Sequence, residues 1–124
     1  MLREFHRVLK LGGRVAAYVI HTPNDLSIEE ETRARELGPS EVTASGSPED
    51  LAASAGLTVI DQRDVTEEYR SLCEALLRVR GELETLLRDE EGDEEYEKGQ
   101  SDKVSRLKGI DEGLLQRSLI VAVK

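Results

Sequence analysis

The chain has 124 residues, of which 38% are hydrophobic and 35% are charged, and its formal net charge at pH 7 is −9. This length suits one domain, and the negative charge disfavours a nucleic-acid backbone or an anionic membrane as partner. The sequence holds no run near the ~18 apolar residues that a membrane span needs, and the single cysteine, Cys73, excludes an internal disulfide. We therefore expect a cytoplasmic protein that binds neither nucleic acid nor membrane.

The beginning of the chain predicts a helix, a turn and a buried strand. Apolar residues recur on one helical face from Leu2 to Leu9, and Gly12 and Gly13 then end the helix, because glycine takes a left-handed conformation without steric penalty. The run RVAAYVI that follows is almost entirely apolar. Such a run is typical of a parallel strand that is covered on both faces and has neighbours on both sides.

Two shorter helices and a second strand are predicted in the middle of the chain. One helix is expected between Ser27 and Leu37. Another begins at the motif SPED, where Ser47 is a suitable N-cap and proline occupies the first helical position. The run LTVIDQRDV, residues 57–65, predicts a strand that is buried in its first half and exposed in its second.

The last third of the chain predicts two helices and a final strand. A long helix is expected over residues 66–88, followed by an acidic turn over 89–97, a further helix, and the strand RSLIVAVK over 117–124. The long helix carries an apolar stripe that packing of the two helices can bury. This stripe includes Leu72, Leu76, Leu83 and Leu87.

Three stretches together resemble the second half of class I S-adenosylmethionine-dependent methyltransferases. REFHRVLKLGGRVAAYVI (3–20) is similar to the helix, glycine turn and fifth strand of that family. SPEDLAASAGLTVIDQRDVTEEY (47–69) and DEGLLQRSLIVAVK (111–124) are similar to the segments that contain the sixth and seventh strands. Leu11 stands where the family usually has proline, but the two glycines still permit the turn.

The resemblance implies an α/β fold, namely part of a Rossmann-like methyltransferase domain. Its three-stranded mixed sheet would place the last strand antiparallel between the other two, so that the strand from Val15 to Ile20 pairs with the segment from Leu119 to Val123. Residues 1–124 would form one partial domain with a helical insertion at about 66–113. The other edge of the first strand has no partner in this sequence, and an unpaired edge invites pairing with another chain.

The family holds S-adenosylmethionine with a glycine-rich loop after its first strand and an acidic residue at the end of its second, and neither feature occurs here. Gly12 and Gly13 lie between a helix and a strand, whereas a nucleotide-binding turn runs from strand to helix. We therefore expect the acceptor-side half of a methyltransferase, whose acceptor is a small molecule, and no binding of S-adenosylmethionine by this chain alone. Under this interpretation the missing neighbours of the first strand precede residue 1.

Two other interpretations stay open. The chain can be a non-catalytic interaction module, or a truncated reading frame, that pairs through the edge from Val15 to Ile20 with a complementing half or with a second copy of itself.

The candidate substrate-binding residues are His21, Thr22 and Tyr69. His21 and Thr22 follow the first strand at its carboxyl end, where ligands bind in open α/β sheets, and the resemblance places the acceptor pocket there. His21 can contact an acceptor or serve as a general base; the alternative is a loop histidine without chemistry. Tyr69 begins the long helix and can face the same cleft or the core.

The other residue types point to no further chemistry. Cys73 lies on the apolar stripe of the long helix, so we expect a buried thiol. The acidic turn lacks the ligand spacing of a calcium-binding loop. We assign no catalytic residue, no cofactor-binding residue and no metal site from the sequence.

Overall fold

The computed structural model describes residues 2–39 and 47–124. Its sheet has the order β1-β3-β2, formed by β1 (Arg14–His21), β2 (Thr58–Asp64) and β3 (Gln116–Val123). β3 is antiparallel to both neighbours. The predicted arrangement, with the last strand antiparallel between the other two, is confirmed.

The register of the sheet also agrees with the prediction for the first strand. Val15 pairs with Ala122 and Tyr18 pairs with Leu119. The turn at Gly12, whose φ is +79°, extends this ladder, because Gly12 N–H donates to the Lys124 carbonyl over 3.0 Å. The double glycine therefore continues the hydrogen-bonded pairing of β1 with β3 beyond the end of β3.

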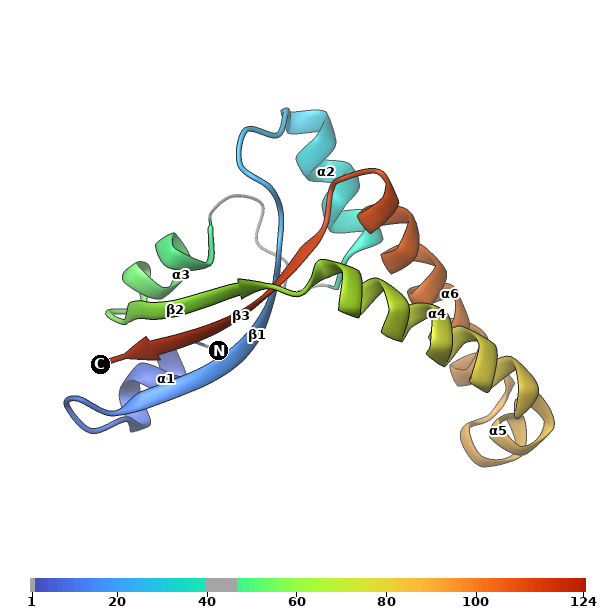
Figure 1. Ribbon diagram of the computed structural model, residues 1–124. Coiled ribbons are helices and arrows are strands. Elements are labelled where there is room, and N and C mark those ends of the chain that lie inside the picture. The colour runs from blue at the N-terminus through green and yellow to red at the C-terminus, as the bar shows by residue number, and fades with distance from the viewer. Residues whose placement is uncertain (1, 40–46) are drawn as a thin grey trace.

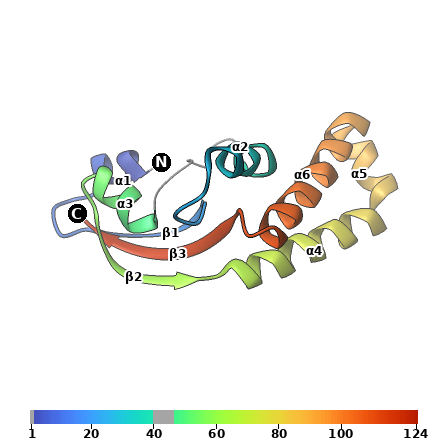
Figure 2. The ribbon, with the colours of Figure 1, turned by 90° about the horizontal axis from the view of Figure 1, so that it is seen from above.

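Three short helices lie on one side of the sheet: α1 (Leu2–Val8), α2 (Ile28–Leu37) and α3 (Pro48–Ser54). Figure 2 shows them above the strands, and no helix of the described residues lies over the middle of the opposite side. The predicted cap is present: Ser47 accepts a hydrogen bond from the third residue of α3. Ser27 caps α2 in the same way. We call the side of the sheet without helices the uncovered face.

Burial along β1 corrects one expectation. The strand was predicted to be covered on both faces, but exposed and partly buried residues alternate along it, and only Val19 and His21 are buried. Tyr18 is 54% exposed. The alternation arises because β1 is an edge strand with helices on one side only; its pairing in the described part of the chain is the antiparallel one with β3.

A helical arm leaves the end of the sheet and gives the molecule a bent outline (Figure 1). It consists of α4 (Thr66–Glu82), α5 (Glu84–Glu91) and α6 (Asp93–Asp111). The single long helix predicted over 66–88 is wrong, since it is interrupted at Leu83. The acidic turn predicted over 89–97 is also wrong: Gly92 alone, at φ +90°, makes the turn, and the acidic residues after it begin α6, where the helix dipole favours negative charge.

The apolar stripe on α4 is only partly buried by the arm. Cys73 and Leu77 are turned toward α6 and at least partly buried, whereas Leu72 and Leu76, one position before each, are 45% and 40% exposed. The expectation that packing between the two helices buries the stripe is therefore wrong for these leucines. At 3.6 residues per turn, one contact face cannot hold both sets.

Two buried clusters join these elements. One lies between α1, α3 and the sheet, and the other between α2, α6 and the start of β3. The buried members of the first are Ala52, Leu57 and Ala122. Those of the second are Ala34, Ile110, Leu114 and Leu115. None of the described helices is long and apolar enough to cross a membrane.

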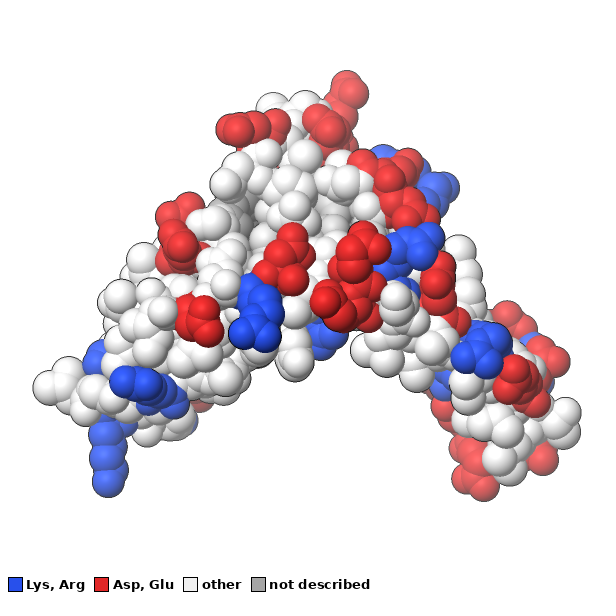
Figure 3. Space-filling model, in the orientation of Figure 1, with Lys and Arg blue, Asp and Glu red and all other residues white. Residues whose placement is uncertain are grey.

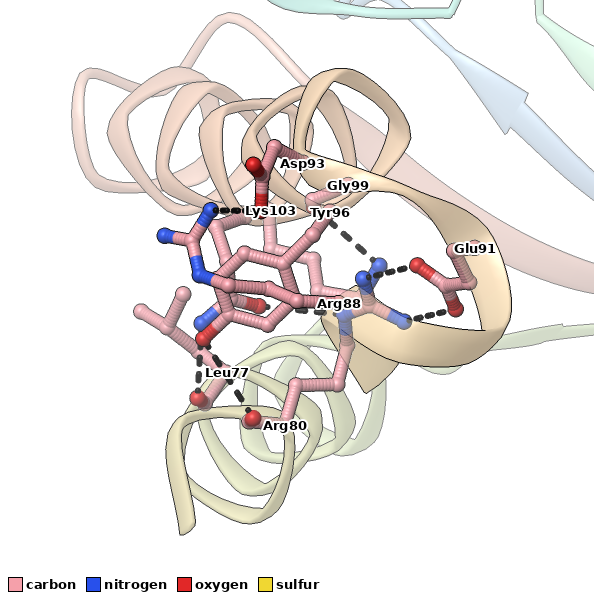
Figure 4. Close-up of polar contacts among 9 residues, drawn as sticks. Leu77, Arg80, Arg88, Glu91, Asp93, Tyr96, Gly99 and Lys103 are labelled. Carbon is pink, nitrogen blue, oxygen red and sulfur yellow. Dashed lines mark hydrogen bonds and ion pairs between the residues drawn. The ribbon is translucent and has the colours of Figure 1, made fainter. Parts of the chain in front are cut away.

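The tip of the arm is held by a buried tyrosine between two arginines (Figure 4). The guanidinium carbons of Arg88 and Arg80 lie 4.4 and 5.4 Å from the centre of the Tyr96 ring. Arg80 pairs with Glu91 over 2.9 Å, and Arg88 pairs with Asp93 over 3.1 Å. These contacts connect α4, α5 and α6, so we interpret the cluster as a structural clamp.

The central strand should dominate stability. Replacing Ile120→Ala, at a position with 0% exposure, should lower the free energy of unfolding by about 2–5 kcal/mol, because a cavity forms in the middle of the sheet. The matched control is Ile60→Ala, at an irregular point of β2 where the side chain is 49% exposed, with an expected loss of no more than about 1 kcal/mol. Urea unfolding followed by circular dichroism measures both, and equal losses would contradict the assignment.

Candidate functional site

His21, the last residue of β1, is 5% exposed and bound on both ring nitrogens. Its Nδ1 lies 3.2 Å from the Thr22 carbonyl oxygen and its Nε2 lies 2.9 Å from Ser118 Oγ. A carbonyl can only accept, so the proton belongs on Nδ1, and the Ser118 hydroxyl then donates to Nε2. This pattern describes a neutral imidazole.

The surroundings of His21 favour the same protonation state. Burial lowers the pKa of the imidazole below its ordinary value of 6.5, while the Thr22 carbonyl and the Asp64 carboxylate act in the opposite direction and are weaker. Asp64 pairs with Ser118 in the β2–β3 register, and its carboxylate accepts from Thr66 N–H over 2.9 Å. These hydrogen bonds to Thr66 lower the pKa of Asp64.

Thr22, the second predicted residue, is buried directly after β1. Its backbone carbonyl holds the His21 ring, and so the two predicted residues form one unit. Sequence reasoning missed Ser118, the third member, because a serine within a final strand carries no signal of its own. The antiparallel register, in which Ser118 pairs with Val19, is what brings it to His21.

Tyr69, the third predicted residue, lies apart from this unit. It is half-buried near the start of α4 and packs against the cluster around Ile110 and Leu115. Burial raises the pKa of its phenol, followed by smaller contributions from Cys73. The structure places Tyr69 beside Arg117, the neighbour of Ser118 in β3, whereas His21 binds Ser118 itself.

Tyr69 forms a second group of side chains together with Arg117 and Tyr18. The Arg117 guanidinium carbon lies 4.1 Å from the centre of the Tyr18 ring and 4.7 Å from that of Tyr69. Successive residues of a strand point to opposite faces, so Arg117 and Ser118 carry the two groups on opposite sides of β3. The sequence alone did not single out Arg117, because its surroundings are formed by aromatic rings that β1 and α4 bring to it.

The arm offers a hollow but no comparable site. It has a volume of about 450 Å³ and is lined by charged residues of α4, α5 and α6, among them Arg80, Glu95 and Lys98. Arg80 is already paired with Glu91 there. Within residues 2–39 and 47–124, no group of three or more histidine, cysteine, aspartate or glutamate side chains is arranged to hold a metal ion.

Comparison with known proteins gives a likeness in fold. No family model and no curated protein sequence matches the chain. A putative sarcosine dimethylglycine methyltransferase from Galdieria sulphuraria superposes with a TM-score of 0.79 at 14% identity, over 99% of this chain and 46% of that one. Phosphoethanolamine N-methyltransferase 2 from Haemonchus contortus, in complex with phosphomonomethylethanolamine and S-adenosylhomocysteine, superposes with a TM-score of 0.73 at 17% identity, over 99% and 29%.

The chain has a methyltransferase-like fold. The likeness extends over the sheet and the helical arm, because 99% of the chain is covered in both superpositions. The chain spans less than half the length of these solved proteins. The 4+2 cyclase SpnF matches as well, with a TM-score of 0.59 at 17% identity over 99% of this chain and 43% of that one. The methyltransferase-like fold is therefore found with more than one reaction.

The burial of neutral His21 predicts a pH dependence of stability. The unfolded chain takes up a proton near pH 6.5, whereas the folded chain resists it, since its imidazole pKa is lowered. The contribution of His21 is therefore present above about pH 6.5 and is lost as the pH falls below it. Melting temperatures between pH 7.5 and 5.5 should fall less steeply in His21→Gln than in the wild type.

The control is His6→Gln, which removes the other histidine of the chain and should keep the wild-type slope. A wild-type slope in His21→Gln would show that another group controls this pH range.

Proposed function

We propose that this chain is the acceptor-side part of an S-adenosylmethionine-dependent methyltransferase domain, which transfers a methyl group to a small nucleophilic acceptor. The observation that supports the proposal is that the edge strand β1 is paired on one side and the sheet is covered by helices on one face. Within the described residues, β1 pairs on one side only, and no helix lies over the middle of the face opposite α1 and α3. A sheet of this kind exposes backbone donors, backbone acceptors and apolar side chains that a complete α/β domain covers.

The described residues of this chain do not fit S-adenosylmethionine. The Gly12 N–H donates to the sheet ladder. At Gly56, a positive-φ glycine just before β2, a Cβ would stand 3.0 Å from the His6 ring, so a side chain rather than a ligand fills that space. Under the proposal another part of the enzyme holds the cofactor, which supplies the methyl group, and the present chain supplies one wall of the acceptor pocket.

In this proposal the unit formed by His21, Thr22 and Ser118 positions the pocket. The buried imidazole accepts from Ser118 and donates to Thr22, which fixes the carboxyl end of β1 against β3. Methyl transfer depends mainly on proximity and in-line alignment of the acceptor with the sulfonium. A rigid wall at this end of the sheet therefore serves the reaction without a direct contact from His21.

Three observations test the proposal together. Calorimetric titration of the chain with S-adenosylmethionine should give no binding heat, and a radiolabelled methyl-transfer assay on the chain should show no product. The DNA upstream of the Met1 codon, translated in frame, should encode a strand followed by a glycine-rich loop. Tight cofactor binding by the chain would overturn the assignment of the acceptor side, and a stop codon close upstream would contradict the split-domain part of it.

The free edge of β1 favours one second candidate, a non-catalytic module that adds its strand to another chain. This candidate predicts association through β1, whereas it predicts no methyl transfer by any assembly that contains the chain. Light scattering after size-exclusion chromatography, over a hundredfold range of concentration, should show a rise in mass. A well-folded monomer throughout would count against pairing with a second copy.

A further inference from the structure

We propose that Arg117 is the receiving group of an oxyanion site on the uncovered face of the sheet, at the carboxyl end of β1. The ligand is a small molecule that carries a phosphate or carboxylate group. Identifying this anion as part of the methyl acceptor rests on the proposed function, whereas binding of the anion itself does not.

The position of Arg117 follows from the register of the sheet. Arg117 pairs with Ile20 near the end of β1. Ala122, five residues further along β3, packs against α3 and therefore points to the covered face. Side chains alternate along a strand, so Arg117 points to the uncovered face. Its carbonyl accepts from Val65 N–H over 2.9 Å, which places it beside the end of β2 as well.

Two tyrosine rings hold the guanidinium in place. Tyr18 comes from β1 and Tyr69 from α4, at 4.1 and 4.7 Å from the guanidinium carbon. An arginine over aromatic faces keeps its N–H donors available, because the rings attract the positive charge without accepting strong hydrogen bonds. The arrangement therefore orients the cation, and a ligand would meet its terminal nitrogens, because Nε is buried.

No carboxylate of the described residues pairs with Arg117. Its Nε is buried and has no hydrogen-bond partner. Arg70, Arg80 and Arg88, in contrast, each pair with at least one carboxylate. A partly buried cation without a counter-charge is unfavourable, and a chain with net charge −9 has many carboxylates that could have served.

Charged residues of both signs lie on this face around Arg117, and one of them is a second arginine. Arg63 of β2 pairs with Leu119, two residues along β3 from Arg117, so both arginines point to the same face. Asp61 pairs with Val121, four residues along β3 from Arg117, and so a carboxylate lies on this face as well. The first turn of α4 adds Glu67 and Glu68 next to the end of β2. Figure 3, which looks onto the uncovered face, shows charged side chains crowded over the arm and sparser over the strands.

These observations favour a small anion. The guanidinium fork matches the geometry of phosphate and carboxylate oxygens. The carboxyl end of the strands is also the place where open α/β sheets bind their ligands. Tyrosine fluorescence can report on the site, since Tyr18 and Tyr69 are two of the three tyrosines of a chain that has no tryptophan.

The test is a titration of the chain with inorganic phosphate, and separately with acetate, at constant ionic strength. Tyrosine fluorescence and the Nε–H resonance of Arg117 report binding. Saturable binding is expected for the wild type. Arg117→Gln should weaken it at least about tenfold, as loss of a charged hydrogen bond implies. The matched control is Arg14→Gln, which removes an exposed arginine from the same face at the other end of β1 and should leave binding unchanged.

The two ligands identify the oxyanion, and a conservative variant guards against misfolding. Stronger binding of phosphate than of acetate would assign a phosphate group, and the reverse would assign a carboxylate. Arg117→Lys keeps the charge between the rings but loses the fork, so binding should weaken several-fold while circular dichroism stays that of the wild type. Absence of saturable binding to the wild type, an equal loss in Arg14→Gln, or unchanged affinity in Arg117→Lys would each overturn the proposal.

Discussion

Every strand pairing of the described residues passes through β3. The strand pairs with β1 on one side and β2 on the other, and its residues Ser118, Ile120 and Ala122 are buried. Because β3 lies between β1 and β2, these two strands are joined only through it among the described residues. The helices on the covered face and the arm also pack against this part of the chain, since both buried clusters include residues from β3 or the turn before it.

The two faces of the sheet differ in how far helices cover them. One face carries α1, α2 and α3, whereas no helix of the described residues lies over the middle of the other (Figure 2). By the register, Tyr18, Leu119 and Val121 belong to that uncovered face. A parallel strand covered on both faces is what the apolar run in β1 predicts. The difference between that pattern and the observed alternation is physically informative: the composition of β1 is suited to more cover than the described residues supply.

The end of β3 nearest the arm presents different chemistry on its two faces. Ser118 points to the covered side and fixes neutral His21, while Arg117 points to the uncovered side and lies between two tyrosines. Adjacent residues can do this because strand side chains alternate. Both ring nitrogens of the covered His21 are hydrogen-bonded, whereas the buried Nε of Arg117 has no hydrogen-bond partner among the described residues.

Local signals in the sequence were sufficient for the elements whose boundaries depend on local chemistry. Ser27 and Ser47 begin their helices as predicted, because an N-cap needs only its own hydroxyl and the next turn of backbone. The order of the strands was also predictable, although through a resemblance and not through periodicity. The long helix over 66–88 was not, since no proline marks the interruption at Leu83 and the clamp of Tyr96 by Arg80 and Arg88 forms only when three helices meet.

The candidate site divides in the same way. His21 and Thr22 could be named from the sequence because they end an apolar strand, and the ends of strands are local features. Their partner Ser118, and the grouping of Tyr18 and Tyr69 around Arg117, required the antiparallel register that joins residues about 50 to 100 positions apart. The sequence by itself determined where strands and helices begin and which of their faces are apolar. Tertiary structure alone decided which side chains meet, because contacts between distant residues depend on register and packing, which no local pattern encodes.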